Sequence, residues 1–445
     1  MKRLLQSAAL FVVLFAVALS QAPATEKAGK YPFVVPATKA IEQIKDLEKV
    51  SGKTLRLHAD EAKMLAEAAT GKLETFTLTE AALIASGAVE PAKRKEYCEK
   101  LDSIEADARK ALEGIDNIKA KGDKLLQFLH AGPMKNGYES EQTDLTVVLD
   151  TGKFNCVSSA VLYNLLAQRL GLEVKAYSIP ASTTGMGHAF SVLCDGDKRI
   201  PVETTNAKGF NVSENMKRTN KHEIGDLALI ATIYYNHGVG FEKKKQYHQA
   251  LHANLCALAL DKTNVSASKN ALANLTNWGV DLSCEEKHAE ALEVIRVNLE
   301  LAPKDAKALQ NRKAFVSQIV MKELKAKKYD EALRRIEEHK TLLGDKQTCR
   351  QLALNVHDTH AQEHREKKDW EKVVAVYVAA LKSMPKDSHL TNNLVATFDE
   401  WAGKHMDSSD WTAAIRVFEQ GLQHLPGNSH LTNNLRYCEE QMKRK

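Results

Sequence analysis

The spacing of hydrophobic positions divides this chain into three regions. From Pro36 onward, apolar residues recur every three or four positions, as one face of a helix requires; the first such set is Ile41, Ile44, Leu47 and Val50. A capping pair, Thr77 and Glu80, precedes another helix that Gly87 ends, and two more helical runs follow. We therefore expect an N-terminal helical subdomain over residues 25–135.

The pattern changes in the second region, residues 136–225. Apolar residues keep helical spacing directly after Asn155 and Cys156, and Gly171 ends that helix. Alternation typical of strands follows, over residues 172–181, 188–194 and 198–205. The dipeptide Asp195-Gly196 is typical of a tight turn, so the last two strands should form a hairpin. This region is expected to be an α+β domain.

From about Asp226 the sequence repeats with a period of 41 residues. An aromatic residue or histidine marks each unit, and a small residue or valine follows three positions later; the pairs are Tyr247 and Ala250, His288 and Ala291, Tyr329 and Ala332, Trp370 and Val373, and Trp411 and Ala414. Such a repeat predicts five helix pairs over residues 226–445, stacked as an all-α solenoid with a concave face. We expect the residues before 226 to fold without this array.

Three residues suited to nucleophilic catalysis occur in order in the α+β region: Cys156, His188 and Glu203. Cys156 is expected at a helix N-terminus, where the helix dipole and a nearby imidazolium favour the thiolate, the nucleophilic form. His188 and Glu203 each lie seven residues from the predicted turn, so they should be near neighbours across the hairpin. The carboxylate would then orient the imidazole, and the imidazole would take the thiol proton.

Two asparagines are candidates for supporting roles. The backbone amide of Cys156, together with the side chain of Asn155, is a candidate to stabilise an oxyanion, and Asn206 is a reserve candidate for orienting His188. Each catalytic assignment has a plainer alternative: Cys156 as a core residue, His188 as a structural residue, and Glu203 as a solvated strand residue.

The order of GKFNC, GHAFSVL and RIPVETT resembles the transglutaminase-like superfamily, over about residues 120 to 215. The resemblance implies a papain-like α+β core and a cysteine hydrolase or acyl-transferase that acts on a protein or peptide amide without metal or organic cofactor. That family usually has Asp in the third position, where this chain has Glu203. Family members without turnover imply the alternative, an inactive scaffold that only binds protein partners.

The C-terminal units resemble tetratricopeptide repeats, which implies a protein partner on the concave face. Gly238 and Gly279 stand at the small position of the first helix, and three units close with a proline, namely Pro303, Pro385 and Pro426. The usual period is ~34 residues, so each unit has about seven additional residues. We expect these residues between the proline of one unit and the first helix of the next.

Composition restricts the class of protein. The 445 residues include 44% apolar and 27% charged residues, with a net charge of +5, which are globular values that exclude a disordered chain and a polytopic membrane protein. Acidic and basic residues are interleaved, so nucleic acid is not expected as the main partner.

Residues 1–24 have the pattern of a secretory signal peptide, with Lys2 and Arg3 before an apolar run and small residues after it. The alternative is an uncleaved membrane anchor, but the apolar run is shorter than the ~20 residues of a spanning helix. We therefore expect an exported protein, periplasmic or extracellular, without stable membrane insertion.

The seven cysteines include no CxxC pair, which disfavours zinc and thioredoxin-type sites. Cys156 is expected to remain free, and the other six to be buried apolar residues rather than disulfides. Three histidines share one helix face in the fourth unit, His357, His360 and His364. No acidic residue or cysteine is spaced to complete a metal site with them, so we expect a partly exposed helix face.

Overall fold

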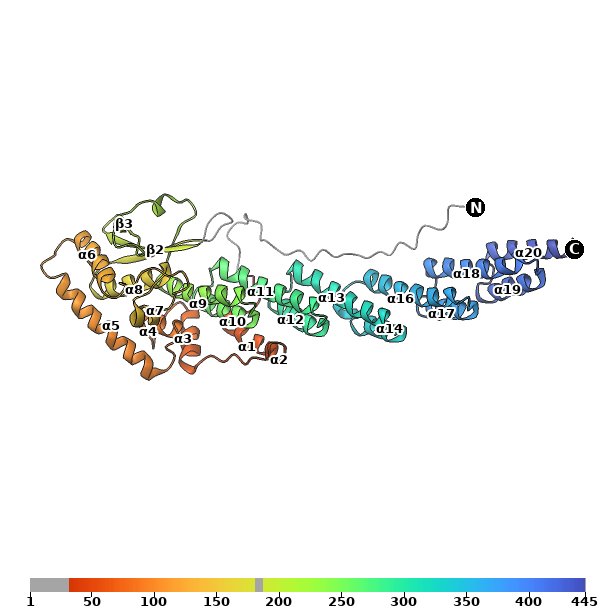
Figure 1. Ribbon diagram of the computed structural model, residues 1–445, viewed down its shortest axis with the longest axis horizontal. Helices are drawn as coiled ribbons and strands as arrows, with labels where there is room; N and C mark the ends of the chain where they lie inside the picture. The colour runs from red at the N-terminus through yellow and green to blue at the C-terminus, as the bar shows by residue number, and fades with distance from the viewer. Residues whose placement is uncertain (1–31, 181–186, 445) are drawn as a thin grey trace. The chain divides into compact units, whose positions relative to one another are not determined.

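The computed structural model describes residues 32–180 and 187–444 (Figure 1). The predicted signal peptide therefore lies outside the described residues. The chain divides into two compact units, residues 1–311 and residues 312–445. Within the described residues, no helix is both long and apolar enough to cross a bilayer.

The first unit begins with the predicted helical region. Its elements are α1 (Ala37–Gln43), η1 (Ile44–Leu47), α2 (Glu48–Ser51), α3 (Ala59–Ala69), α4 (Leu78–Ala85), α5 (Pro91–Ala111) and α6 (Ile118–Ala131). The predicted capping box is present, because Thr77 Oγ1 accepts from the Glu80 amide at 3.2 Å and Glu80 Oε2 accepts from the Thr77 amide at 2.9 Å. Helix α3 had no counterpart in the sequence interpretation.

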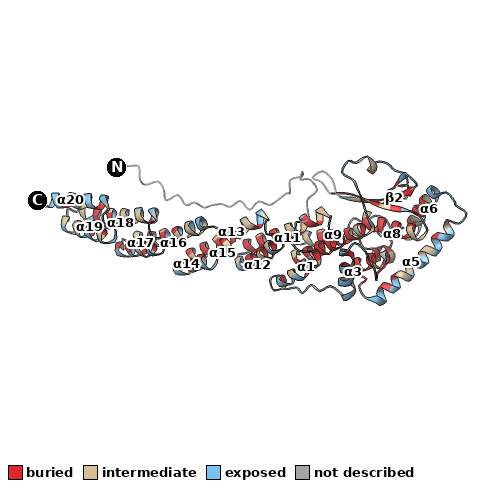
Figure 2. Cartoon of the chain, turned by 180° about the vertical axis from the view of Figure 1, so that it is seen from behind, coloured by how far each residue is buried: buried red, intermediate tan, exposed pale blue. Residues whose placement is uncertain are grey.

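The α+β region follows with α7 (Leu145–Thr151), α8 (Cys156–Arg169), η2 (Asn215–Lys217) and four strands. The strands are β1 (Val174–Ile179), β2 (His188–Asp195), β3 (Lys198–Val202) and β4 (His222–Ile224), in the antiparallel order β3-β2-β1-β4. Helix α8 packs against β1 and β2, and every residue from Val157 to Ala167 is buried. A helix buried on all sides is a core element, in contrast to α5, whose outer face is exposed (Figure 2).

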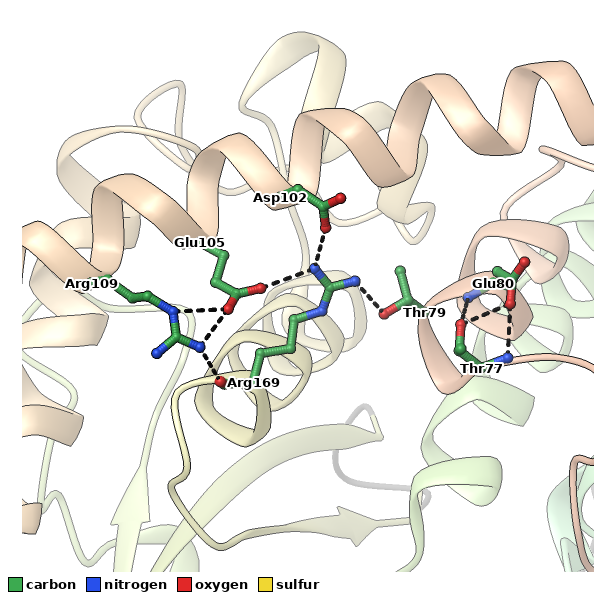
Figure 3. A network of polar contacts seen from close by, with 7 residues as sticks. All are labelled: Thr77, Thr79, Glu80, Asp102, Glu105, Arg109 and Arg169. Carbon is green, nitrogen blue, oxygen red and sulfur yellow. Dashed lines mark hydrogen bonds and ion pairs between the residues drawn. The ribbon is translucent and has the colours of Figure 1, made fainter.

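Arg169 fixes the C-terminal end of α8 (Figure 3). Its guanidinium donates to Asp102 at 2.8 Å and Glu105 at 3.2 Å on α5, and to Thr79 at 3.0 Å on α4. Arg109 in turn donates to the carbonyl oxygen of Arg169 at 2.7 Å. These contacts hold the helix that carries Cys156 at its other end.

The first two helix pairs belong to the same compact unit as the α+β region. They are α9 (Asp226–Lys243) with α10 (Tyr247–Leu260), and α11 (Val265–Cys284) with α12 (His288–Leu301). Helix α9 packs against α4 and α8, and α10 packs against α1 and α3. The repeats and the residues before 226 therefore share a core, contrary to the expectation that those residues fold without the array.

The remaining helices are α13 (Ala306–Lys325), α14 (Tyr329–Glu338), α15 (Lys340–Leu343), α16 (Lys346–Glu366), α17 (Trp370–Ser383), α18 (Ser388–Asp407), α19 (Trp411–His424) and α20 (Ser429–Lys443). Each of the five predicted markers is the first residue of the second helix in a pair, as in α10, α12, α14, α17 and α19. The small residue or valine three positions later is fully buried in every unit. The predicted helix-pair repeat is confirmed.

The position of the additional residues in each unit was predicted incorrectly. Helices α13, α18 and α20 begin three residues after Pro303, Pro385 and Pro426, so no long connection exists there. Instead, the first helices of the pairs are long; α11, α13 and α18 have 20 residues each. The reason is early capping, because the side chains of Asp387 and Asn428 accept amide hydrogen bonds directly before α18 and α20.

The turn between the two helices of each pair contains a left-handed residue that is not glycine. These residues are Lys245, Glu286, Lys327, Lys368 and Ser409, with φ between 56° and 60°. They recur with the same period of 41 as the sequence markers. The repeat is therefore maintained in backbone conformation as well as in packing.

Candidate functional site

Cys156 is the first residue of α8, as predicted. Asn155 caps this helix, since its Oδ1 accepts from the amides of Val157 at 2.9 Å and Ser158 at 3.1 Å. Ser158 Oγ completes the capping box by accepting from the Asn155 amide at 3.0 Å. As the first residue of a helix, Cys156 has a backbone N–H without a carbonyl partner inside the helix. Its thiol stands at the positive end of a buried helix.

The Asn155 side chain also holds the preceding loop. Its Nδ2 donates to the Ser140 carbonyl oxygen at 3.1 Å, and the residue is only 2% exposed. Asn155 thus serves first as the structural cap of α8, and its contribution to an oxyanion site stays a prediction.

His188 and Glu203 are in direct contact, with 2.7 Å between His188 Nε2 and Glu203 Oε2. The hairpin register differs from the predicted one, because Asp195 pairs with Lys198 and Ser191 pairs with Val202. Gly196 and Asp197 therefore form the turn, one residue later than predicted. Glu203 follows the end of β3 and reaches His188 diagonally.

The charges of the site reinforce one another. Burial alone would lower the pKa of His188, but hydrogen bonds and charge interactions with Cys156 and Glu203 outweigh burial and raise the pKa to about 10. For Glu203 the directions are reversed: burial alone would raise its pKa, but the contact with His188 brings the pKa below its ordinary value. His188 is consequently an imidazolium beside a carboxylate at neutral pH. Since Nε2 holds Glu203, Nδ1 is the nitrogen left for Cys156.

Two residues that the sequence interpretation did not select hold Glu203. Asn215 Nδ2 donates to Glu203 Oε2 at 2.6 Å, and Thr205 Oγ1 donates to Oε1 at 2.6 Å. Asn206, the reserve candidate, instead accepts from the amide of Lys208 at 2.9 Å. The structure thus brings Cys156, His188 and Glu203 together and leaves Asn206 in a turn beside them. No periodic pattern marks the segment around Asn215, so the sequence had no signal for it.

Tyr138 is a further neighbour of the site. It forms a parallel bridge with Phe154, two residues before Cys156, and is 53% exposed. Burial raises the pKa of its hydroxyl, and charge interactions with Cys156 and Glu203 raise it further.

Within the described residues, no group of three or more His, Cys, Asp or Glu side chains is placed to hold a metal ion. In the fourth unit, His357 is buried, whereas His360 stacks on Tyr329 and lies 3.2 Å from His364, measured between the two Nε2 atoms. All seven cysteines are free thiols. Cys194, Cys256 and Cys438 are buried as expected, but Cys284 is exposed.

Comparisons with known proteins do not place this chain in a family. No protein-family model matches it. No curated protein matches it. Among solved structures, it is similar to the crystal structure of the P58(IPK) TPR domain, with 10% sequence identity over 77% of this chain and 98% of that chain, at a TM-score of 0.17. That TM-score is too low to support an argument, so the description as helix-pair repeats rests on the helices of this chain.

Proposed function

We propose that this protein is a transglutaminase-like cysteine hydrolase or acyl-transferase that acts on a protein or peptide amide through Cys156, His188 and Glu203. One observation carries the proposal: His188 bonds Glu203 through Nε2 while its ring also interacts with the Cys156 thiol at the start of α8. This is the arrangement of nucleophile, base and orienting acid that acyl transfer requires.

The reactive form of the site is the ion pair in which the proton of the Cys156 thiol resides on His188. The thiolate attacks the carbonyl carbon of the amide, and the C–S bond forms as the carbonyl electron pair moves to oxygen. The backbone N–H of Cys156 stabilises that oxygen. When the C–N bond breaks, His188 gives its proton to the leaving amine, and a thioester remains on Cys156.

A second substrate then releases the acyl group. Water or an amine attacks the thioester carbon and gives a proton to His188, and the C–S bond breaks to restore the thiolate. Water as the second substrate gives hydrolysis, and an amine gives cross-linking. Glu203 keeps its charge throughout, because its part is to orient and stabilise the imidazolium.

The helix-pair repeats supply the second part of the proposal. Stacked helix pairs form extended surfaces that bind peptides or protein segments, and we assign this part of the chain to holding a protein partner. The basic and apolar pattern of residues 1–24 supports export to the periplasm or the extracellular space.

Acylation of the intact protein tests the catalytic part. The protein is mixed with p-nitrophenyl acetate, release of p-nitrophenol is followed, and mass spectrometry locates the acetyl group. We expect a thioester on Cys156 and loss of the rapid phase in Cys156→Ser, whereas Cys284→Ser, which removes an exposed thiol, behaves as the unaltered protein. Absence of acylation at Cys156 would favour the inactive scaffold that only binds protein partners.

A further inference from the structure

The loop before α8 runs beside the residues that lead to Cys156. The Glu139 amide donates to the Phe154 carbonyl oxygen at 2.8 Å, and the Phe154 amide donates to the Gly137 carbonyl oxygen at 3.3 Å. These two bonds fix Tyr138 opposite Phe154, as a parallel bridge. Because Cys156 comes only two residues after Phe154, the loop places Tyr138 beside the start of the catalytic helix.

The ring of Tyr138 is supported on one side and open on the other. It meets the Phe154 ring edge-on, with 6.3 Å between centroids. Phe154 is itself only 2% exposed and meets His130 edge-on at 5.3 Å, so the support is rigid. Tyr138 remains 53% exposed, so a bound substrate can contact it.

The Tyr138 hydroxyl is electrostatically coupled to the site. Burial raises its pKa first, and charge interactions with Cys156 and Glu203 raise it further. The phenol is therefore protonated at neutral pH and can donate a hydrogen bond. A neutral hydrogen-bond donor near the reacting sulfur can stabilise a negative charge that develops on the substrate only during the reaction.

We propose that the Tyr138 hydroxyl binds the carbonyl oxygen of the substrate and shares with the Cys156 backbone N–H the negative charge that forms when Cys156 attacks. This inference rests on the proposed function, because it assigns a substrate-contacting residue to that reaction. The hydrogen bond strengthens as the C–S bond forms and the carbonyl oxygen gains charge. Loss of one such donor typically slows the acyl-transfer step by about 10² to 10³.

Two reagents separate this role from a structural one. Acylation of Cys156 by p-nitrophenyl acetate passes through an oxyanion, whereas alkylation by iodoacetamide displaces iodide and forms none. Tyr138→Phe removes only the hydroxyl oxygen and keeps the ring against Phe154. We expect this variant to be acylated at least tenfold more slowly while its alkylation rate at Cys156 stays within twofold of the unaltered protein.

Tyr437→Phe is the matched control. Tyr437 is 48% exposed and meets Trp411 edge-on at 6.3 Å, so its surroundings resemble those of Tyr138, but it lies in the C-terminal helix α20. Both rates should be unchanged in this variant. Equal acylation rates in Tyr138→Phe and the unaltered protein overturn the assignment, as does an equal fall in both rates, which would mean that Tyr138 acts through the thiol. A protein that alkylates but is never acylated at Cys156 overturns the proposed function as well.

Discussion

Glu203 accepts a hydrogen bond from His188 at 2.7 Å although its position after β3 places it across from Phe190 rather than from His188. The carboxylate therefore reaches back along the hairpin by about two residues. Aspartate, the residue that the transglutaminase-like pattern usually has here, is shorter by one methylene. The longer side chain of Glu203 spans this offset.

The first prediction concerns stability and pH. Replacing Glu203 by Gln should lower the free energy of unfolding by about 2 kcal/mol at pH 6, because a half-buried hydrogen bond between charged groups is lost. The lowered pKa of Glu203 gives stability that is present above its ordinary value of 4.5. The raised pKa of His188 gives stability that is complete below 6.5 and lost as the pH rises through about 10.

The difference between Glu203→Gln and the unaltered protein should therefore be largest between about pH 5 and 6.5 and should shrink towards pH 10. Urea unfolding at pH 6, 8 and 10 measures it. A difference that is the same at all three pH values would contradict the ion pair.

A second prediction separates two asparagines. Asn215 donates to the same Glu203 oxygen that accepts from His188, so Asn215→Ala should loosen the carboxylate and slow acylation of Cys156 by about tenfold. Asn206→Ala removes an acceptor for the Lys208 amide and should leave the rate within twofold. The p-nitrophenol burst measures both. The assignment of Asn215 as a positioning residue fails if the two variants behave alike.

A third prediction follows from the packing of α9 on α8. Ile230 and Ile233 of α9 are buried, and Asn236 and His237 bond Thr143 and Asp144 at 3.0 and 2.6 Å. Thr143 and Asp144 directly follow the loop whose Ser140 carbonyl oxygen accepts a hydrogen bond from Asn155. A chain of residues 1–225 lacks all these contacts and should aggregate or unfold without cooperativity.

The matched truncation keeps the whole first compact unit, residues 1–311. It should unfold cooperatively and label at Cys156 as fast as the full chain. Circular dichroism melts and thiol labelling compare the two proteins. A cooperative melt and full labelling in residues 1–225 would show that α9 is dispensable.

A fourth prediction concerns the left-handed turns of the repeats. Lys368 has φ of 60°, a conformation that costs a residue with a Cβ about 1–2 kcal/mol and glycine much less. Lys368→Gly should therefore raise the free energy of unfolding by about 0.5–1 kcal/mol, after the greater chain entropy of glycine is subtracted. Lys368→Ala removes the same side chain but keeps the Cβ, so it should not stabilise. Equal effects of the two substitutions on the melting temperature would rule out backbone strain as the cause.

Sequence patterns were informative where periodic packing determines the structure. The 41-residue markers predicted the helix pairs, and Asn155 with Cys156 predicted the start of α8, because burial leaves regular spacings and capping favours particular residues. Contacts that depend on tertiary structure left no such spacing. Asn215 reaches Glu203 from a segment without repeated apolar positions, and Tyr138 is positioned by two backbone bonds to another segment.

The errors have local causes. The hairpin turn was displaced by one residue because Gly196 and Asp197 form the loop while Asp195 still pairs with Lys198. The additional residues of each unit were expected in a connection, but a capping side chain such as Asp387 starts the next helix early. In both cases a single side chain or residue decides a boundary that the hydrophobic pattern does not resolve.

The most direct test of the central claim is the alkylation of Cys156 by iodoacetamide at pH 6, where an ordinary thiol with a pKa of ~8.5 is almost wholly protonated. Peptide mapping measures the rate at Cys156 and, within the same protein, at the exposed Cys284. We predict that Cys156 reacts at least tenfold faster than Cys284, and that His188→Ala abolishes the difference while His222→Ala, at an exposed position of β4, preserves it. Reaction of Cys156 at the rate of Cys284, or a fast rate that survives in His188→Ala, would contradict the account.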